Sequence, residues 1–343
     1  MEKMAKAGFV TIIGKPNVGK STLMNTLIGQ KIAITSYKPQ TTRRDIRTVY
    51  TEERGQIVFL DTPGMRVMKD RLGRYMLKAA RSKLAEADCI LWLMEPRVRR
   101  TANGQEAADP LAKLDEEDRA ILKELAGVKA PVILVITKRD TVKKAEVLPV
   151  INACADAWRK MTGEELPDII PVSSRTGEGI GDLKASLFEK LPEGEPFYGE
   201  DTVTTETERD IAAEIIREKT LRLLQEEVPH GIAVVIRKMH FRKRKPPKTA
   251  GALSAAEQKG KAKIRQDEIC DLEADIICER EAHKGIIIGA GGQMLRKIGT
   301  AARVDIENMT GCRVNLQLFV KVRRDWKDDA GALKQFGYDE KKL

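Results

Sequence analysis

Residues 14–21 read GKPNVGKS, a glycine-rich stretch that ends in Lys-Ser and directly follows a short apolar run. Successive backbone N–H groups can surround phosphate oxygens only where side chains do not intervene, and Gly14 and Gly19 meet that requirement. Lys20 adds a positive charge for the β- and γ-phosphates, and the Ser21 hydroxyl is a suitable ligand for Mg²⁺. This spacing between a strand and a helix predicts the phosphate-binding loop of a nucleotide site.

The helix after this loop is predicted over residues 20–28 and ends before Gly29. Its N-terminus carries the positive end of the helix dipole, which favours bound phosphate. The loop and the first helical residues therefore supply the predicted phosphate contacts: Gly14, Lys15, Pro16, Asn17, Val18, Gly19, Lys20, Ser21 and Thr22.

A second motif, DTPG at residues 61–64, follows an apolar run that ends at residue 60. An aspartate here can hold the water shell of Mg²⁺, and the Gly64 amide can contact a γ-phosphate that is lost on hydrolysis. Thr42, in the sequence PQTTR between the two motifs, is predicted to join Ser21 as a Mg²⁺ ligand. Predicted contributors to hydrolysis are Lys20, Thr42, Asp61 and Gly64, while Thr62, Pro63 and Met65 are predicted to line the nucleotide.

Base recognition is predicted at TKRD, residues 137–140, which follows the apolar run at residues 131–136. The Asp140 carboxylate can accept hydrogen bonds from both N1–H and N2–H₂ of guanine, a pairing that adenine cannot offer, and the Lys138 stem can pack along the base. The sequence SSR, at the end of the next predicted strand, would place backbone N–H groups near guanine O6. The predicted base contacts are Thr137, Lys138, Arg139, Asp140, Ser173, Ser174 and Arg175.

The elements that must position these motifs alternate along the first half of the chain. Strand-like apolar runs lie at 56–60, 88–94, 131–136 and 169–172, with helical periodicity between them and a closing helix at 181–191. Such alternation predicts an α/β domain with a mostly parallel sheet covered by helices on both faces. We predict that this domain spans residues 1–195 and that residues 196–205, which begin with the last proline of the sequence PEGEP and contain three threonines, form a linker.

The second half, residues 206–343, has a different pattern. An amphipathic helix at 206–227 precedes strands near 232–239, 269–278 and 314–322, in the order α-β-β-α-α-β. Residues 285–299, GIIIGAGGQMLRKIG, contain the GxxG loop of a KH module, which holds about four nucleotides of single-stranded RNA. The predicted RNA contacts are Ile288, Gly289, Ala290, Gly291, Gly292, Met294, Arg296 and Lys297.

The net charge of +10 comes from one segment, because eleven Lys/Arg and a single acidic residue lie between residues 237 and 265. We predict a basic insertion at 240–265 that can lie along a phosphate backbone or an anionic membrane surface. No apolar run approaches the roughly 18 residues of a membrane span, and no signal-peptide core precedes Phe9. Five scattered cysteines without a CxxC pair predict reduced thiols in a cytoplasmic protein and no zinc site.

Taken in order and spacing, GKPNVGKS, PQTTR, DTPG, TKRD and SSR resemble the five signature elements of translation-factor-type GTPases, specifically the Era family of the TrmE–Era–EngA-like group. The second half resembles the C-terminal type II KH domain of that family. The chain departs from the family pattern at four places. Thr137 replaces the usual Asn, SSR replaces SA[KL], Met65 replaces the glutamine that orients water in Ras-like enzymes, and Ala290 stands where Lys is common.

The resemblance implies a Mg²⁺-dependent P-loop GTPase, with GTP and GDP as ligands and slow intrinsic hydrolysis. Related GTPases without the glutamine use an asparagine to hold K⁺, which assigns that catalytic role to Asn17. The implied partners are the 3′ end of small-subunit ribosomal RNA and the small ribosomal subunit. The resemblance also implies a monomer in the cytoplasm, with peripheral contact to the inner face of the membrane. Two alternatives stay open: an RNA-binding protein whose G domain does not hydrolyse GTP, and a P-loop ATP enzyme such as a kinase.

Overall fold

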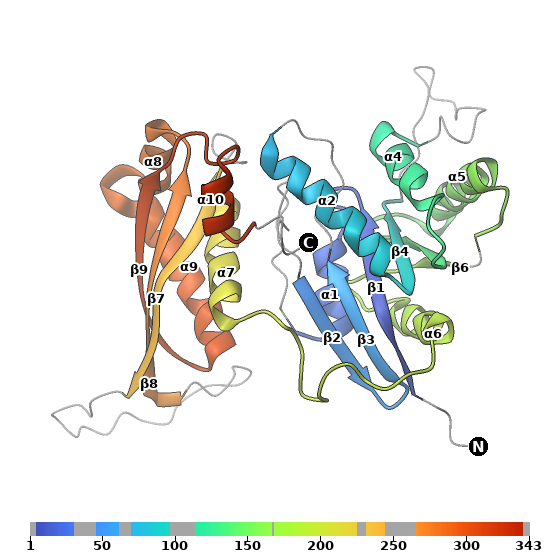
Figure 1. Cartoon of the computed structure of the whole chain (residues 1–343), viewed down its shortest axis with the longest axis horizontal. Helices are drawn as coiled ribbons and strands as arrows, with labels where there is room; N and C mark the ends of the chain where they lie inside the picture. Colours follow the sequence, from blue (N-terminus) through green and yellow to red (C-terminus); the bar gives the residue numbers. More distant parts are fainter. Residues whose placement is uncertain are drawn as a thin grey trace. The chain divides into compact units, whose positions relative to one another are not determined.

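The computed structural model describes residues 5–30, 46–61, 70–96, 114–166, 168–224, 231–243 and 265–338. The chain divides into two compact units (Figure 1). Unit 1 comprises Met1–Thr205 with Gly337–Leu343, and unit 2 comprises Glu206–Phe336. Thr42 and residues 62–65 lie outside the described residues, as does the segment 244–264.

Unit 1 contains a six-stranded sheet in the order β2-β3-β1-β4-β5-β6. All neighbouring pairs are parallel except β2, which runs antiparallel to β3 at one edge. The prediction of a mostly parallel α/β sheet is confirmed. The strands are β1 (Lys6–Gly14), β2 (Ile46–Glu52), β3 (Gly55–Asp61), β4 (Cys89–Met94), β5 (Val132–Ile136) and β6 (Asp168–Pro171).

Helices cover both faces of this sheet, because successive side chains of the central strands point to opposite faces. Ile12 packs in the cluster formed by α1 and α6, whereas Ile13 packs in the cluster formed by α2, α4 and α5. The apolar runs that predicted strands are therefore buried on both sides. The helices are α1 (Lys20–Ile28), α2 (Arg71–Glu86), α4 (Glu116–Leu125), α5 (Lys144–Thr162) and α6 (Ile180–Lys190), with a 3₁₀ turn η1 at Arg139–Thr141.

Residues 196–205 pack along the edge of the sheet in unit 1. The Val49 N–H donates to the Val203 carbonyl at 2.8 Å, and Thr204 forms an isolated β-bridge with Thr48. The Gln56 side chain donates to the Tyr198 carbonyl at 2.9 Å and accepts from the Tyr198 N–H at 3.0 Å. The segment predicted as a linker is thus attached to β2 and β3 by hydrogen bonds.

Unit 2 has a three-stranded sheet in the order β7-β8-β9, antiparallel between β7 and β8 and parallel between β8 and β9. Its helices share one hydrophobic core with one face of the sheet, where Leu272, Ala274 and Ile276 alternate along β8. The element order α-β-β-α-α-β agrees with the sequence prediction. The elements are α7 (Glu208–Leu223), β7 (Ala233–Lys243), β8 (Arg265–Cys278), α8 (Glu281–Ile288), α9 (Gln293–Thr310) and β9 (Cys312–Val322), followed by a short α10 (Ala330–Gln335).

The ends of the predicted basic insertion belong to strands. Residues 240–243 continue β7, where Lys243 pairs with Glu268 of β8, and β8 itself begins at Arg265. The five cysteines are free and buried. In the described part of the chain, no helix is both long and apolar enough to cross a membrane.

Candidate functional site

The phosphate-binding loop connects β1 to α1 through backbone geometry that its glycines permit. A Cβ on Gly14 would lie 2.8 Å from the Leu93 carbonyl oxygen, so no larger residue fits there without a shift of the backbone. Gly19, just before α1, has a φ of 105°, in the left-handed region where side chains are strained. Asn17 adopts a φ of 64° in the same loop. The chain therefore turns tightly enough to aim its N–H groups at one place.

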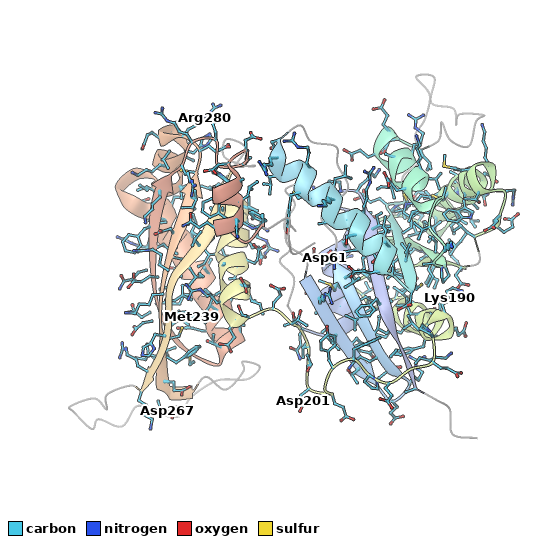
Figure 2. The ribbon with its side chains drawn as sticks, in the orientation of Figure 1. Asp61, Lys190, Asp201, Met239, Asp267 and Arg280 are labelled. Atoms are coloured by element: carbon cyan, nitrogen blue, oxygen red, sulfur yellow. The ribbon has the colours of Figure 1, made fainter. Side chains whose placement is uncertain are left out.

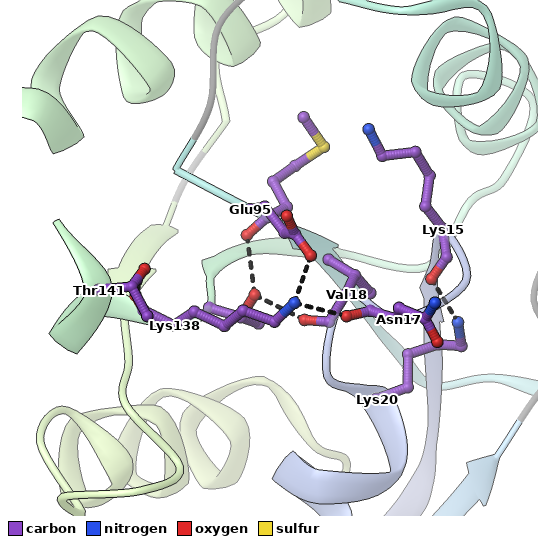
Figure 3. Close-up of polar contacts among 9 residues, drawn as sticks. Lys15, Asn17, Val18, Lys20, Glu95, Lys138 and Thr141 are labelled. Atoms are coloured by element: carbon purple, nitrogen blue, oxygen red, sulfur yellow. Dashed lines mark hydrogen bonds and ion pairs between the residues drawn. The ribbon is translucent and has the colours of Figure 1, made fainter. Parts of the chain in front are cut away.

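Lys20 lies buried beneath this loop, and its ammonium group donates a hydrogen bond to the Gly14 carbonyl at 2.9 Å. It also donates to the Lys15 carbonyl at 2.8 Å (Figure 3). Burial lowers the pKa of Lys20 to about 8, although the negative charge of Asp61 acts in the opposite direction. A buried cation favours a nearby anion, because a phosphate would offset the loss of hydration. This lysine is therefore placed for a phosphate ligand.

Oxygen atoms suited to Mg²⁺ meet at the start of α1. Asp61, the last residue of β3, pairs with Ile12 in the adjacent strand, and its carboxylate lies 3.4 Å from the Ser21 hydroxyl (Figure 2). Hydroxyl and carboxylate oxygens are the donors Mg²⁺ prefers, and the ion usually completes its shell with water and nucleotide phosphates. Among the described residues, no group of three His, Cys, Asp or Glu side chains could hold a metal ion alone. Ser21 and Asp61 thus fit a Mg²⁺–nucleotide complex, in which the ion would neutralise phosphate charge.

Part of the predicted nucleotide site lies outside the described residues. This applies to the second predicted Mg²⁺ ligand and to the residues after Asp61 in the DTPG motif. They are Thr42, Thr62, Pro63, Gly64 and Met65.

Two side chains just beyond β5, in the segment predicted to contact the base, bind the phosphate loop. The buried Thr137 hydroxyl donates to the Val18 carbonyl at 2.7 Å, with the Met94 carbonyl as a second acceptor at 3.1 Å. The Lys138 ammonium donates to the Asn17 carbonyl at 2.7 Å and pairs with Glu95 (Figure 3). Thr137, which departs from the family's Asn, therefore still links the two motifs.

Asp140 is held as an ionised acceptor. The Ser173 hydroxyl donates to Asp140 Oδ1 at 2.7 Å, and the Arg175 guanidinium lies 2.8 Å from Oδ2. The Ser173 hydrogen bond is the largest cause that lowers the pKa of Asp140, and against the effect of burial its own backbone N–H and the charge of Arg175 lower the pKa further. The Ser174 carbonyl accepts from Thr26 of α1 at 3.2 Å, so SSR, TKRD and α1 converge. Arg139 is different, since its guanidinium donates to the Val142 carbonyl next to η1.

In unit 2, the GxxG loop joins α8 to α9 with three glycines at positive φ. The φ angles are 70° at Gly289, 55° at Gly291 and 76° at Gly292. A Cβ on Gly289 would lie 2.7 Å from the Cβ of Met294, so this position needs glycine. Ala290 is exposed at the tip, whereas Ile288 is half-buried. The loop therefore exposes backbone at the entrance to α9.

A cleft of about 390 Å³ lies between α9 and β9 next to this loop. Of the predicted RNA contacts, Gly292 and Arg296 line it, whereas Lys297 does not and Met294 packs against the core. The sequence prediction missed the remaining lining residues. They are Leu295, Gly299, Thr300 and Arg303 on α9 and Val314, Asn315, Leu316 and Leu318 on β9. The helical spacing from Gly292 through Arg296 and Gly299 to Arg303 is a signal that could have found the α9 side.

Comparison with known proteins decides the family. A model of the family described as 50S ribosome-binding GTPase matches residues 9–138, and a KH domain model matches residues 252–327. "GTPase Era" of Alkaliphilus metalliredigens is 42% identical over 334 residues, which cover 97% of this chain and 99% of the relative. The chain belongs to the Era family of GTPases. "GTPase Era" of Clostridioides difficile, 41% identical over 341 residues, covers 98% of the chain.

Two solved Era structures resemble the whole chain at a TM-score of 0.80 and 36% identity. One is Era in complex with MgGDPNP and nucleotides 1506–1542 of 16S ribosomal RNA, and it covers 98% of this chain. The other is a variant of Aquifex aeolicus Era bound to GDP·AlF₄⁻, which covers 97%. As an Era GTPase, the chain combines a P-loop G domain that uses GTP, GDP and Mg²⁺ with a C-terminal KH domain.

We predict that Asp140 selects guanine. Replacing Asp140 by Asn removes the negative charge and exchanges one of the two acceptor oxygens for an NH₂ donor, and each charged hydrogen bond is worth about 1.5–3 kcal/mol. GDP affinity should fall roughly 100-fold or more, and xanthine nucleotides should bind instead. Competition against a fluorescent GDP measures both effects, with the exposed Asp201→Asn as a control that leaves affinity unchanged. Equal affinity of the unaltered protein for ATP and GTP would contradict the assignment.

A second prediction concerns Thr137. Thr137→Val keeps the shape of the side chain but leaves the buried Val18 carbonyl without its hydroxyl donor, which should lower the free energy of unfolding by about 1–3 kcal/mol and weaken GDP binding. Thr137→Ser retains the hydroxyl and should retain most of both quantities. Urea unfolding and GDP titration of the two variants test this. Equal losses in Val and Ser variants would assign the effect to packing rather than to the hydrogen bond.

Proposed function

We propose that this protein is a GTP-hydrolysing switch that binds the 3′ region of 16S ribosomal RNA through its KH domain and acts in the biogenesis of the small ribosomal subunit. The observation that carries the proposal is the glycine loop beside the α9–β9 cleft, in a chain that matches RNA-bound Era over nearly its full length. The GTP site and the RNA cleft lie in separate compact units. Such a separation suits a protein in which one ligand regulates the binding of another.

The chemistry of the cleft supports single-stranded RNA as its ligand. Leu295, Leu316 and Leu318 offer apolar surface for unstacked bases. Ala290 provides no charge at the loop tip, but Arg296, exposed in the first turn of α9, lies in the same cleft. The exposed backbone of the glycine loop and Arg296 would together hold phosphates, while the strand side of the cleft would contact bases.

The same proposal assigns residues to GTP hydrolysis. Lys20 would stabilise phosphate charge, Ser21 and Thr42 would bind Mg²⁺, and Asp61 would orient the water shell of the ion. The Gly64 amide would contact the γ-phosphate. With Met65 in place of a water-orienting glutamine, a cation held by Asn17 would offset the charge that develops in the transition state.

The partner we propose is the small ribosomal subunit, bound by a protein that works as a monomer in the cytoplasm. The basic segment 240–265 is the candidate contact with RNA phosphates outside the cleft, and with the anionic inner face of the membrane. Two alternative functions make different demands. A protein with an inert G domain would bind RNA without turning GTP over in a single-turnover assay, and an ATP enzyme would prefer ATP in competition.

Asn17 generates a prediction about monovalent cations. Turnover of GTP should rise when Na⁺ is exchanged for K⁺ at constant ionic strength, because a dehydrated K⁺ bound by Asn17 adds positive charge at the phosphates. Asn17→Gly should lose this rise yet keep nucleotide binding, since glycine adopts the φ of 64° at this position without strain. Steady-state phosphate release in the two salts is the measurement. Identical rates of the unaltered protein in Na⁺ and K⁺ would remove Asn17 from this role.

The function as a whole is tested at the GxxG loop. Replacing both Ala290 and Gly291 by Asp places two negative charges where RNA phosphates would lie, and should abolish specific binding of an oligonucleotide with the 3′ sequence of 16S ribosomal RNA. Gly311→Asp is the matched control, because Gly311 also has a positive φ and open space around it. Unchanged preference for the matched over a scrambled oligonucleotide in the loop variant would contradict the proposal.

In the same assay, the basic segment should contribute affinity without sequence preference. Exchanging residues 244–264 for a short Gly-Ser turn removes six Lys/Arg and leaves the paired ends of β7 and β8 intact. Each lost phosphate contact lowers the slope of log K against log salt by about 0.7, so the slope should fall by up to about 4. Matched and scrambled RNA should weaken alike. Loss of the preference with an unchanged slope would instead identify the segment as a base reader.

A further inference from the structure

Lys15, the second residue of the phosphate-binding loop, connects that loop to helix α4. Its side chain runs away from Lys20 (Figure 3) and ends between two carboxylates, 2.5 Å from Asp115 Oδ2 and 2.6 Å from Asp118 Oδ2. Asp115 is also the N-cap of α4, where its other oxygen accepts from the Asp118 N–H at 2.9 Å. The start of α4 is therefore built around the Lys15 ammonium.

This cluster differs from an ordinary surface ion pair in its burial. The Asp118 side chain is only 4% exposed and that of Lys15 is 21% exposed. Asp118 Oδ1 is buried without a hydrogen-bond partner among the described groups. A buried carboxylate with incomplete hydrogen bonding costs folding free energy, and a well-packed apolar residue would often be more stable. Stability alone is therefore a poor reason for this arrangement.

The backbone of Lys15 links the cluster to the nucleotide site. Its carbonyl oxygen accepts from the Lys20 ammonium at 2.8 Å, so one residue contacts the phosphate-binding lysine through its backbone and α4 through its side chain. A shift of the Lys15 side chain would move the carbonyl that orients the Lys20 ammonium. Errors of about 1 Å in the position of a binding group are costly for ligands held by directed contacts.

We propose that Asp115 and Asp118 are positioning residues for nucleotide binding, which hold Lys15 and thereby fix the carbonyl that orients the Lys20 ammonium. The proposal rests on the GTP site of the proposed function and on no part of its RNA assignment. A simpler electrostatic effect predicts the opposite result. If the carboxylates acted only by repelling phosphates, their removal would tighten nucleotide binding.

Protonation of Asp118 provides a distinguishing signature. Burial raises the pKa of Asp118 to about 7 against the opposing effect of Lys15. Burial lowers the pKa of Lys15, but its hydrogen bonds to Asp115 and Asp118 outweigh this and raise it overall. The other titratable groups near Asp118 are Asp115, Glu117 on the same helix turn and the Cys154 thiol of α5. Burial tends to raise the pKa of Asp115, but the contacts with Lys15 lower it overall. Burial raises the pKa of Cys154. Near neutral pH, Asp118 is therefore the group of this cluster that changes charge, while Lys20, with a pKa of about 8, titrates at the upper end of the same range.

The two possible roles of Asp118 then depend on pH in different ways. Its pKa is higher in the folded than in the unfolded protein, so its contribution to the free energy of unfolding is fully present below about pH 4 and is lost as pH rises through 7. If Asp118 were only structural, its ionisation would lower stability and nucleotide affinity would not rise over this range. If ionised Asp118 holds Lys15 in place, affinity rises as stability falls.

The experiment measures binding of fluorescent GDP and GTP to the full chain from pH 6 to 8. Asp118→Asn, which imitates the protonated acid, and Lys15→Met should each weaken binding about fivefold or more at pH 8, whereas Asp118→Glu and Lys15→Arg should restore most of it. The double variant Lys15→Met/Asp118→Asn should bind no more weakly than Lys15→Met alone, because Asp118 acts through Lys15. The rise in affinity with pH should be smaller in Asp118→Asn than in the unaltered protein. Comparing the two proteins cancels the titration of the nucleotide and of Lys20, which both share.

Glu116→Gln is the matched control, because Glu116 is exposed in the same turn and its charge is removed without touching the cluster. Three results would overturn the proposal. They are additive losses of nucleotide affinity in the double variant, tighter nucleotide binding by Asp118→Asn, and equal weakening of binding by Glu116→Gln. Thermal unfolding of each variant identifies any that fail to fold, and the pH series on the unaltered protein needs no variant. Failure of the unaltered protein to bind guanine nucleotides would count against the proposed function instead.

Discussion

The buried ammonium group of Lys20 is the constraint on which the rest of unit 1 depends. A cation removed from water loses several kcal/mol of hydration, and in this chain two backbone carbonyls and the nearby Asp61 recover part of that loss. Those carbonyls belong to Gly14 and Lys15, so the loop must keep its oxygens inward and its N–H groups toward the ligand. Such a loop has no helix or sheet hydrogen bonds to hold it, and its shape has to come from neighbours.

The neighbours are supplied by the carboxyl ends of the central parallel strands, where ligands of open α/β sheets bind. Leu93 at the end of β4 packs against Gly14, and Thr137 just beyond β5 binds the Val18 carbonyl. Both strands lie fully buried between two helical layers. The buried strands therefore hold the phosphate loop in place through Leu93 and Thr137. The apolar runs of the sequence thus determine the shape of the site together with its polar residues.

Features fixed by local chemistry could be predicted from the sequence. The spacing from Gly14 to Ser21 admits few chemistries, and strands buried on both faces appear as uninterrupted apolar runs. The edge strand β2, Ile46–Glu52, was missed because half of its residues are polar. Helix α5 contains Pro149, a residue that ordinarily ends a helix, so its full length is not evident from the sequence. The contacts of Lys15 with Asp115 and Asp118 span about 100 residues of sequence and depend on how α4 packs on the sheet. No local pattern reports such a contact.

A nucleotide can alter RNA binding only through groups that differ between its bound states. In unit 1, α1 itself begins with Lys20 and Ser21, and two further described helices, α4 and α2, connect to the nucleotide site. Helix α4 is joined to the phosphate loop at its start and, through Glu124 and Arg81 at 2.6 Å, to α2, which follows the DTPG segment in sequence. An exposed ion pair of this kind is worth at most about 1 kcal/mol, so the Arg81–Glu124 pair can favour one arrangement of the two helices but cannot hold them in it against other forces.

Because coupling between two ligands is reciprocal, RNA bound to unit 2 must change affinity for the nucleotide by the same factor as the nucleotide changes affinity for RNA. The modest strength of the contact between α4 and α2 is compatible with a switch that both ligands can reverse.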